Sequence, residues 1–399
     1  MAAKPTKLEL FLYNVYFGDC FLLIFHYADK TQRSVLIDFG STGKGHSEDT
    51  HATESTGKRL LAVAKDIAVQ TKGKLDVVVA THRHKDHIYG FGLKDAGKLI
   101  LDLDPEIVIQ PWTEDPKNNL DLSKVKALMS SDEFSAAAHK NFVSMLHDMH
   151  SVAEAIEAEA KHLGNKSRFA APISEKVREQ IIFAADDNKN VAKIKNLKAV
   201  QNLAKMRGPH YVSFGYAKVD WKAILPGVNV RILGPPLLED APGITEATNK
   251  SPEFWSLQAM NKYFWGILAA TNRVPEGKPS ERPPLFDAKH VLKGERPANV
   301  RWFMRRLRNV RADQLLQLVR FVDRALNNTS VIMTFEVGDQ RLLFPGDAQI
   351  ENWQFLLDAA KQDPKLKKLL QTTTVYKVGH HGSRNATPRS LWNDFNNRT

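Results

Sequence analysis

The sequence has 399 residues, of which 43% are hydrophobic and 25% are charged. This composition is typical of a globular protein and excludes a disordered or fibrous chain. The formal net charge of +11 favours polyanionic partners such as nucleic acid, or anionic substrates in general. The alternative interpretation of this charge is a basic surface without a specific partner.

The N-terminal sequence lacks an apolar segment that ends in a small-residue cleavage site, and no stretch approaches the roughly 18 apolar residues that span a bilayer. We therefore expect a cytoplasmic protein without a membrane span. Cys20 is the single cysteine, so no intrachain disulfide can form and a zinc site built from thiolates is excluded. Any metal must be held by histidine and carboxylate side chains.

The first part of the chain predicts strands, a helix and a buried strand in that order. Short apolar runs rich in β-forming residues predict strands over 8–15, 20–27 and 34–38. Apolar residues at helical spacing predict a helix over 57–70, and the continuous β-branched run at 75–82 predicts a strand buried on both faces.

A different pattern begins near residue 118. A capping box at Ser130 and Glu133 is followed by apolar residues every three or four positions from 134 to 163. A second helical region follows at about 174–206. The two regions predict a helical hairpin inserted over 118–207.

Strand signals return in "YVSFGYAKV" and "VNVRILGPP", ahead of a Pro-rich loop at 274–286 and a basic helix that begins near residue 302. The last part predicts a β-hairpin that turns at Gly338 and Asp339, a helix over 350–362, and a strand that ends in a histidine pair. Strands at both ends with helices between them predict two packed sheets with helices outside.

The stretch "THRHKDH" places His82, His84, Asp86 and His87 at the carboxyl end of the predicted buried strand. In an extended exit His82 and His84 point the same way, and in the following turn Asp86 and His87 point to a second place. Imidazole and carboxylate are ligands of Zn²⁺, Mn²⁺ and Fe, so two adjacent metal pockets are predicted. The alternative is a solvated polar turn.

Other predicted strands also end in polar side chains of this kind. Asp347 follows "RLLFPG", the pair His380 and His381 follows "VYKVG", and Asp38 follows "VLI". Asp347 could instead cap the next helix, and Asp38 could be a turn residue. We expect Asp38 to bind a metal ligand and so to orient it, as the partners of metal ligands commonly do.

In this order, "LIDFG", "THRHKDH", "FPGD" and "GHHGS" resemble the motifs of the metallo-β-lactamase superfamily. The segments "NNTSVIMTFEVGDQRLLFPGDAQIENW" and "YKVGHHGS" are similar to the β-lactamase-like domain of competence DNA-uptake channel proteins. Matching segments cover residues 8–112 and 226–390, and the helical insertion has no counterpart.

The resemblance implies an α/β (α+β) fold, namely a four-layer αββα sandwich with a long helical insertion. Residues 1–117 and 208–399 would form the two halves of this core, and 118–207 the insertion. The family fold normally adds a strand and a helix after such a C-terminus. We therefore expect the chain to be truncated there, or to be completed by a partner.

Carried over to this chain, the resemblance implies that His82 and His84 bind one metal and that Asp86 and His87 bind the other. Asp347 would bridge the two ions. Zn²⁺ is favoured for both, with Mn²⁺ or Fe as alternatives.

His380 would complete the second metal site, and His381 is the alternative for that place. No histidine takes the third position at the first metal. That pocket would be poorly occupied, or be completed by Asn327, Asn328 or water.

Two divalent cations lower the pKa of a shared water and polarise the oxygen that is attacked, so the implied reaction is a hydrolysis. Asp38 and Asp86 would orient ligands or accept a proton. His381, Ser383 and Lys377 are candidates for protonating a leaving group or holding an oxyanion.

A phosphodiester is the favoured substrate, as in a nuclease, because two cations suit its transition state and the chain is basic. The alternatives within the same class are a phosphocholine-type esterase and a lactone or thioester hydrolase. From another class, the chain could be a nucleic-acid-binding or assembly subunit with a structural or inactive metal site. The helical insertion would then dock a protein partner.

Overall fold

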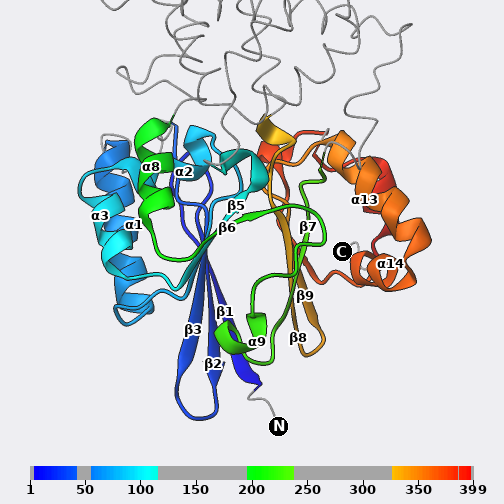
Figure 1. The fold of residues 1–399 in the computed structure, drawn as a ribbon, viewed down its shortest axis with the longest axis horizontal. Coiled ribbons are helices and arrows are strands. Elements are labelled where there is room, and N and C mark those ends of the chain that lie inside the picture. Colours follow the sequence, from blue (N-terminus) through cyan, green and yellow to red (C-terminus); the bar gives the residue numbers. More distant parts are fainter. Residues whose placement is uncertain (1–3, 43–54, 116–195, 238–325, 385, 397–399) are drawn as a thin grey trace, which may run out of the picture. The chain divides into compact units, whose positions relative to one another are not determined.

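The structure is a computed structural model that describes residues 4–42, 55–115, 196–237, 326–384 and 386–396 (Figure 1). The chain divides into two compact units, and every described element belongs to the unit formed by Met1–Asn119, Lys193–Ala247 and Asp323–Thr399. Most of the expected helical hairpin, the Pro-rich loop and the basic helix after it lie outside the described residues.

The first sheet has six strands in the order β1-β2-β3-β4-β5-β6. These strands are β1 (Pro5–Leu12), β2 (Phe21–Tyr27), β3 (Gln32–Ile37), β4 (Val77–Val79), β5 (Ile107–Pro111) and β6 (Pro209–Val212). β1 to β3 are antiparallel, and β3 to β6 are parallel. The carboxyl ends of β3 and β4 therefore meet at one edge of the sheet, where ligands are commonly bound.

The second sheet has four strands in the order β10-β9-β8-β7. They are β7 (Asn229–Gly234), β8 (Ile332–Val337), β9 (Gln340–Phe344) and β10 (Val375–Tyr376). β9 and β10 are parallel, and the other pairs are antiparallel. The hairpin of β8 and β9 turns at Gly338 and Asp339, as the sequence predicts.

Helices follow the strands in both halves. They are α1 (Thr56–Gln70), α2 (Lys85–Gly92), α3 (Ala96–Asp102), α8 (Leu197–Lys205), α9 (Trp221–Ile224), α13 (Ile350–Gln362), α14 (Pro364–Gln371) and α15 (Arg389–Asp394), with 3₁₀ turns η1 (Trp112–Glu114) and η5 (His380–Gly382). α1 begins where the Ser55 side chain accepts a hydrogen bond from the Lys58 N–H. α14 begins in the same way at Asp363, with Pro364 in its first turn.

Three apolar clusters hold these layers together. Val78 of β4 packs with α1, α2, α3 and α8, whereas its neighbours Val77 and Val79 pack toward the second sheet. In β9, Leu342 packs toward the first sheet and Leu343 packs against the helices α13 to α15. Each sheet thus has helices on its outer side and the other sheet on its inner side (Figure 1). Each fully buried Val or Leu side chain stabilises the fold by about 1.5–3 kcal/mol.

The structure confirms the expected α+β combination of mixed sheets and helices, and three elements differ in extent. β4 covers only Val77–Val79 and is therefore shorter than the predicted strand 75–82, so that Thr81 lies outside the strand. The run "YVSFGYAKV" forms a strand only to Val212, because Phe214 bonds to Pro235 O and the chain turns at Gly215. α8, which the sequence assigns to the insertion, packs on α2 in the first unit.

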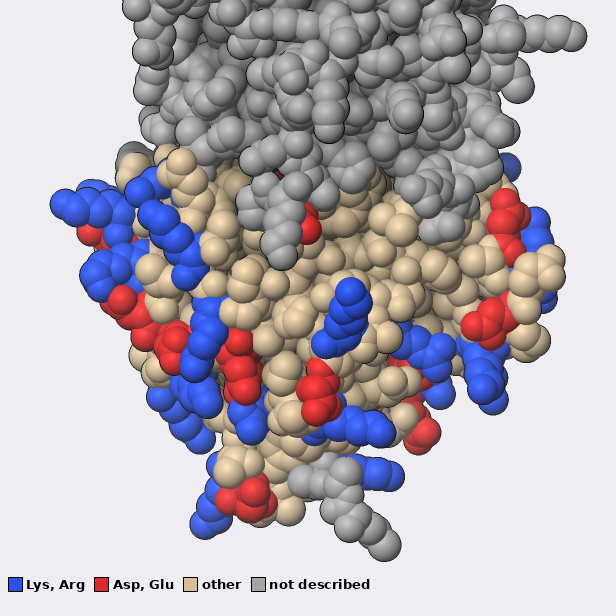
Figure 2. All heavy atoms as spheres, in the orientation of Figure 1, with Lys and Arg blue, Asp and Glu red and all other residues tan. Residues whose placement is uncertain are grey.

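Charged side chains of both signs occur on the face of the molecule that Figure 2 shows. Lys and Arg lie at many points of the face in Figure 2, with Asp and Glu between them. None of the helices in the part of the chain that the structure describes combines the length and apolar composition needed to cross a membrane.

Backbone hydrogen bonds join three chain segments beside the ends of β3 and β4. The Asp19 N–H donates to Asp86 O (2.9 Å), the Phe39 N–H to His87 O (2.7 Å) and the Gly40 N–H to Asp19 O (3.1 Å). A Cβ atom on Gly40 would lie 2.4 Å from both the Asp86 carbonyl carbon and the His87 nitrogen. This close approach requires glycine at position 40.

We predict that Gly40→Ala lowers the free energy of unfolding by about 3 kcal/mol or more, because the methyl group meets backbone that cannot move aside. Chemical denaturation of the two proteins measures the difference. Gly57→Ala is the control, since a Cβ at Gly57 in α1 has no neighbour within 4 Å. It should leave stability unchanged or raise it by up to about 1 kcal/mol. Equal stability of wild type and Gly40→Ala would contradict the close approach.

Candidate metal centre

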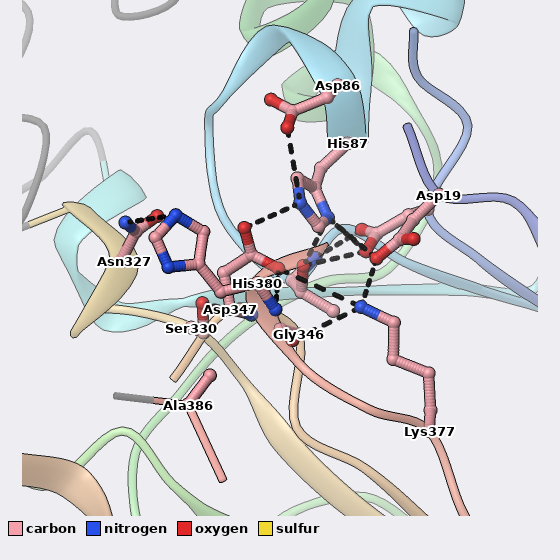
Figure 3. A network of polar contacts seen from close by, with 12 residues as sticks. Asp19, Asp86, His87, Asn327, Ser330, Gly346, Asp347, Lys377, His380 and Ala386 are labelled. Carbon is pink, nitrogen blue, oxygen red and sulfur yellow. Dashed lines mark hydrogen bonds and ion pairs between the residues drawn. The ribbon is translucent and has the colours of Figure 1, made fainter. Parts of the chain in front are cut away.

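Polar residues from both sheets gather where β3, β4 and β9 end (Figure 3). Asp38 follows β3, the segment from Thr81 to His87 follows β4, and Asp347 follows β9. The sequence places these residues at three predicted strand ends. The structure brings the three ends together.

The histidine motif lies between β4 and α2, with a bend at Arg83, and continues into the first turn of α2. His84 is the N-cap residue of α2, and Asp86 and His87 lie in its first turn. His82 Nε2 lies 2.9 Å from His84 Nδ1. None of the four motif residues is more than 4% exposed, so all are removed from bulk water.

His87 is held between two carboxylates. Its Nδ1 lies 2.7 Å from Asp38 Oδ2, and its Nε2 lies 3.2 Å from Asp347 Oδ2. Asp38 also accepts hydrogen bonds from the Thr81 N–H and Oγ1–H, both at 2.8 Å. When His87 is neutral, its hydrogen bond to Asp38 places the proton on Nδ1, so the lone pair of Nε2 points toward Asp347. In metal sites, a carboxylate that binds the other ring nitrogen of a ligating histidine has the same effect.

Asp347 reaches the site because β9 ends in a turn at Gly346, which has a φ of 56°. A Cβ there would lie 2.8 Å from Thr81 Cβ, so glycine is required by both conformation and space. Asp347 Oδ1 accepts a hydrogen bond from the His380 N–H at 2.9 Å. The other carboxylate oxygen, Oδ2, is the one that faces His87.

The electrostatics of the site favour a cation. Burial alone would lower the pKa of His87, but the carboxylates of Asp347 and Asp38 outweigh it and hold this pKa well above its ordinary value. Burial would raise the pKa of Asp347, yet His87, His82 and Lys377 hold it well below its usual range. Burial also lowers the pKa of His82, and neighbouring His87 and His84 lower it further.

Lys377 and Asp19 form an ion pair beside this cluster (Figure 3). The Lys377 Nζ also lies 3.8 Å from Asp347 Oδ1 and donates to Gly346 O at 3.3 Å. Burial opposes the charge on Lys377, but Asp19 and Asp347 outweigh it and raise the pKa of Lys377. The two carboxylates therefore favour the charged form of Lys377 next to Asp347.

The donor set fits a metal ion. Among the described residues, His82, His87 and Asp347 each offer one ligand atom, and these atoms all lie within 4.8 Å of one another. Asp19, Asp38 and His87 form a second such group. His87 Nε2 is buried, and within the part of the chain that the structure describes it faces the carboxylates of Asp347 and Asp86, at 3.2 and 4.0 Å, without a hydrogen bond of good geometry. A nitrogen of this kind is available to a metal.

The remaining expected ligands lie close by but outside these two groups. His84 contacts His82, and Asp86 Oδ2 lies 4.0 Å from His87 Nε2. His380 has a φ of 42°, and its Nε2 lies 3.5 Å from Asn327 Nδ2.

Of the expected alternatives, Asn328 has other surroundings. Asn328 bonds to Glu351 and Gln349 at the start of α13. The side chain of His381 lies outside the described residues, and the Ser383 N–H donates to His380 O.

Several contributors to the site carried no recognisable sequence signal. Asp19 lies in a short turn before β2, and Ser330 accepts a hydrogen bond from the Asp347 N–H at 3.1 Å. Thr81 stands inside the motif but is neither a histidine nor a carboxylate.

Comparison with known protein families, with curated proteins and with solved structures found no match for this chain. The fold and the cluster together define an α+β protein with buried groups of histidine and aspartate that could hold a metal ion. Any assignment of function therefore depends on the chain's own residues.

We predict that Asp38→Asn weakens metal binding about 10- to 100-fold, because the amide removes the charge that orients His87. Calorimetric titration of the chain with Zn²⁺ or Mn²⁺ measures the dissociation constant. Asp358→Asn is the matched control, since Asp358 is an exposed carboxylate on α13. An unchanged dissociation constant in Asp38→Asn would rule out a supporting role for Asp38.

Proposed function

We propose that this chain is a metal-dependent hydrolase of the metallo-β-lactamase type that acts on phosphodiesters, as a nuclease does. One observation carries the proposal: His82 and His87 from the first sheet meet Asp347 from the second sheet. The order of helices, sheet, sheet and helices supports the four-layer sandwich that the sequence motifs imply.

Six residues would hold the cations, namely His82, His84, Asp86, His87, Asp347 and His380. Their nitrogen and oxygen donors suit Zn²⁺, with Mn²⁺ or Fe as alternatives. When bound, divalent cations supply Lewis acidity to the substrate and make hydroxide available near neutral pH.

The chain's own residues would prepare this chemistry. Asp38 orients His87 through Nδ1, and the His380 N–H fixes Asp347 through Oδ1. His87 and Asp347 thus each have one atom held by the protein, and their other atoms, Nε2 and Oδ2, would serve a cation. Such fixed orientation limits the reorganisation that the reaction requires.

Lys377 would stabilise negative charge on the substrate. Its raised pKa keeps it protonated at neutral pH, so it suits an anionic oxygen better than it suits a role as a base. Asp19 holds its ammonium group beside Asp347. At 10% exposure the side chain is largely buried but not sealed from the solvent.

The charge of the chain supports an anionic substrate. The net charge is +11, and Lys and Arg occur at many points of the surface in Figure 2. Acidic residues stand between them, so on this face the charge does not form a single track. This pattern supports anionic substrates as a class, and the choice of nucleic acid needs an assay.

We predict that the wild-type chain with added Mn²⁺ or Zn²⁺ hydrolyses bis-p-nitrophenyl phosphate and at least one of DNA and RNA. Asp347→Ala should lower kcat/KM at least about 100-fold, because several kcal/mol of transition-state stabilisation depend on the cations. Binding of DNA should persist in Asp347→Ala.

Asp358→Ala on α13 is the control and should keep full activity. A lactone and a phosphocholine ester in the same assay test the other hydrolase chemistries. Absence of turnover on every substrate with any divalent cation would contradict the proposed function, and DNA binding without turnover would indicate a binding subunit instead.

A further inference from the structure

Arg83 separates the two histidines at the start of the motif and makes a buried ion pair of its own. Its Nη2 donates to Glu114 Oε2 at 2.6 Å, and its Nε donates to Glu114 Oε1 and Oε2 at 3.0 and 3.2 Å. The side chains of Arg83 and Glu114 are only 3% and 4% exposed. Neither residue belongs to the metal-binding groups around His87.

The backbone of Arg83 is held as well. The Asn196 Nδ2 donates to Arg83 O at 2.7 Å. Asn196 is the N-cap residue of α8, and Asn202 in the same helix donates to Phe91 O at 2.8 Å. α8 therefore binds both the loop that carries His82 and His84 and the helix α2 that carries Asp86 and His87.

Glu114 and Asn196 are far apart in the sequence. Glu114 ends η1, directly after β5, and Asn196 opens α8. Residues 116–195 lie between them in the sequence. The two side chains that hold Arg83 thus come from two segments that are distant in the sequence.

A buried ion pair of this geometry contributes more to the orientation of its side chains than to the stability of the fold. The free energy needed to remove two charges from water is about as large as the free energy gained from their attraction. An apolar pair of equal volume would therefore stabilise the fold equally well. The planar guanidinium and the carboxylate, however, bind in a fork that fixes direction as well as distance. Arg83 is the one residue between His82 and His84, so a fixed Arg83 limits the movement of both.

We propose that Arg83 is a positioning residue for the metal site: its fork with Glu114 and its bond from Asn196 hold His82 and His84 in place as ligands. This inference rests on the proposed function, since it assumes a cation at these histidines. Arg83 itself touches neither the cation nor the substrate. Loss of the fork should therefore weaken metal binding while the fold persists.

The test compares full-length wild type with Arg83→Met, Glu114→Gln and the double variant Arg83→Met/Glu114→Leu. Calorimetric titration with Mn²⁺ and Zn²⁺ gives the dissociation constants, and thermal unfolding without metal gives the stability. We expect each variant to bind metal about 10- to 100-fold more weakly, as residues that orient ligands do. In Arg83→Lys, which keeps the charge and loses the fork, we expect an intermediate constant.

Arg33→Met is the matched control. Arg33 pairs with Asp76 at 2.7 Å, and Asp76 precedes β4 at the end opposite to the motif. This variant also removes an arginine from a carboxylate pair, and Asp76 keeps its bonds from the Ser34 N–H and Oγ. Its dissociation constant for metal should stay within twofold of the wild-type value.

Each outcome of these measurements supports or overturns the role of Arg83. Dissociation constants within twofold of wild type in folded Arg83→Met would overturn the inference, even if the unfolding temperature falls. If the single variants do not fold because a buried charge is left unpaired, the metal affinity of the double variant tests the inference. If the double variant does not fold either, Arg83 has a purely structural role and the inference is overturned. Weakened metal binding in a chain without hydrolytic activity would support Arg83 and contradict the proposed function, whereas a wild type that binds no metal contradicts both.

Discussion

The contacts on the two nitrogens of His87 are the constraint on which the rest of the site depends. Asp38 binds Nδ1 at 2.7 Å, and Asp347 lies 3.2 Å from Nε2. These contacts join the ends of β3, β4 and β9, and therefore join the two sheets, at a ring that is fully buried. A buried imidazole between two carboxylates is costly unless a positive charge is present, which in this site is a proton or a metal ion.

The surrounding structure can be understood as support for that arrangement. Gly40 and Gly346 let backbone segments approach the motif closely, and the Asp347 N–H is bound by Ser330. Lys377 balances the charge of Asp347 from the other side. The packed sheets supply rigid strands, so the side chains at the strand ends are held in fixed positions, as a binding or catalytic site requires.

The sequence predicted that the histidine motif and Asp347 follow the ends of strands, because each carries a local signal. A buried β-branched run followed by His82 to His87 is such a signal, and so is Asp347 after a hairpin strand. The partners of these residues could not be predicted in the same way. Lys377 with Asp19 and Arg83 with Glu114 are pairs between distant segments, and a lone charged residue in a sequence does not indicate its partner. The lengths of β4 and β6 also differed, since pairing and turns of the folded chain, rather than local propensity, decide where a strand ends.

Anomalous diffraction from crystals of the full chain grown with Mn²⁺ tests the central claim most directly. The account predicts an anomalous peak coordinated by His87 Nε2 and Asp347 Oδ2, with His82 as a further ligand. A crystal with Mn²⁺ bound elsewhere, and with His87 and Asp347 in contact only with each other, would contradict it.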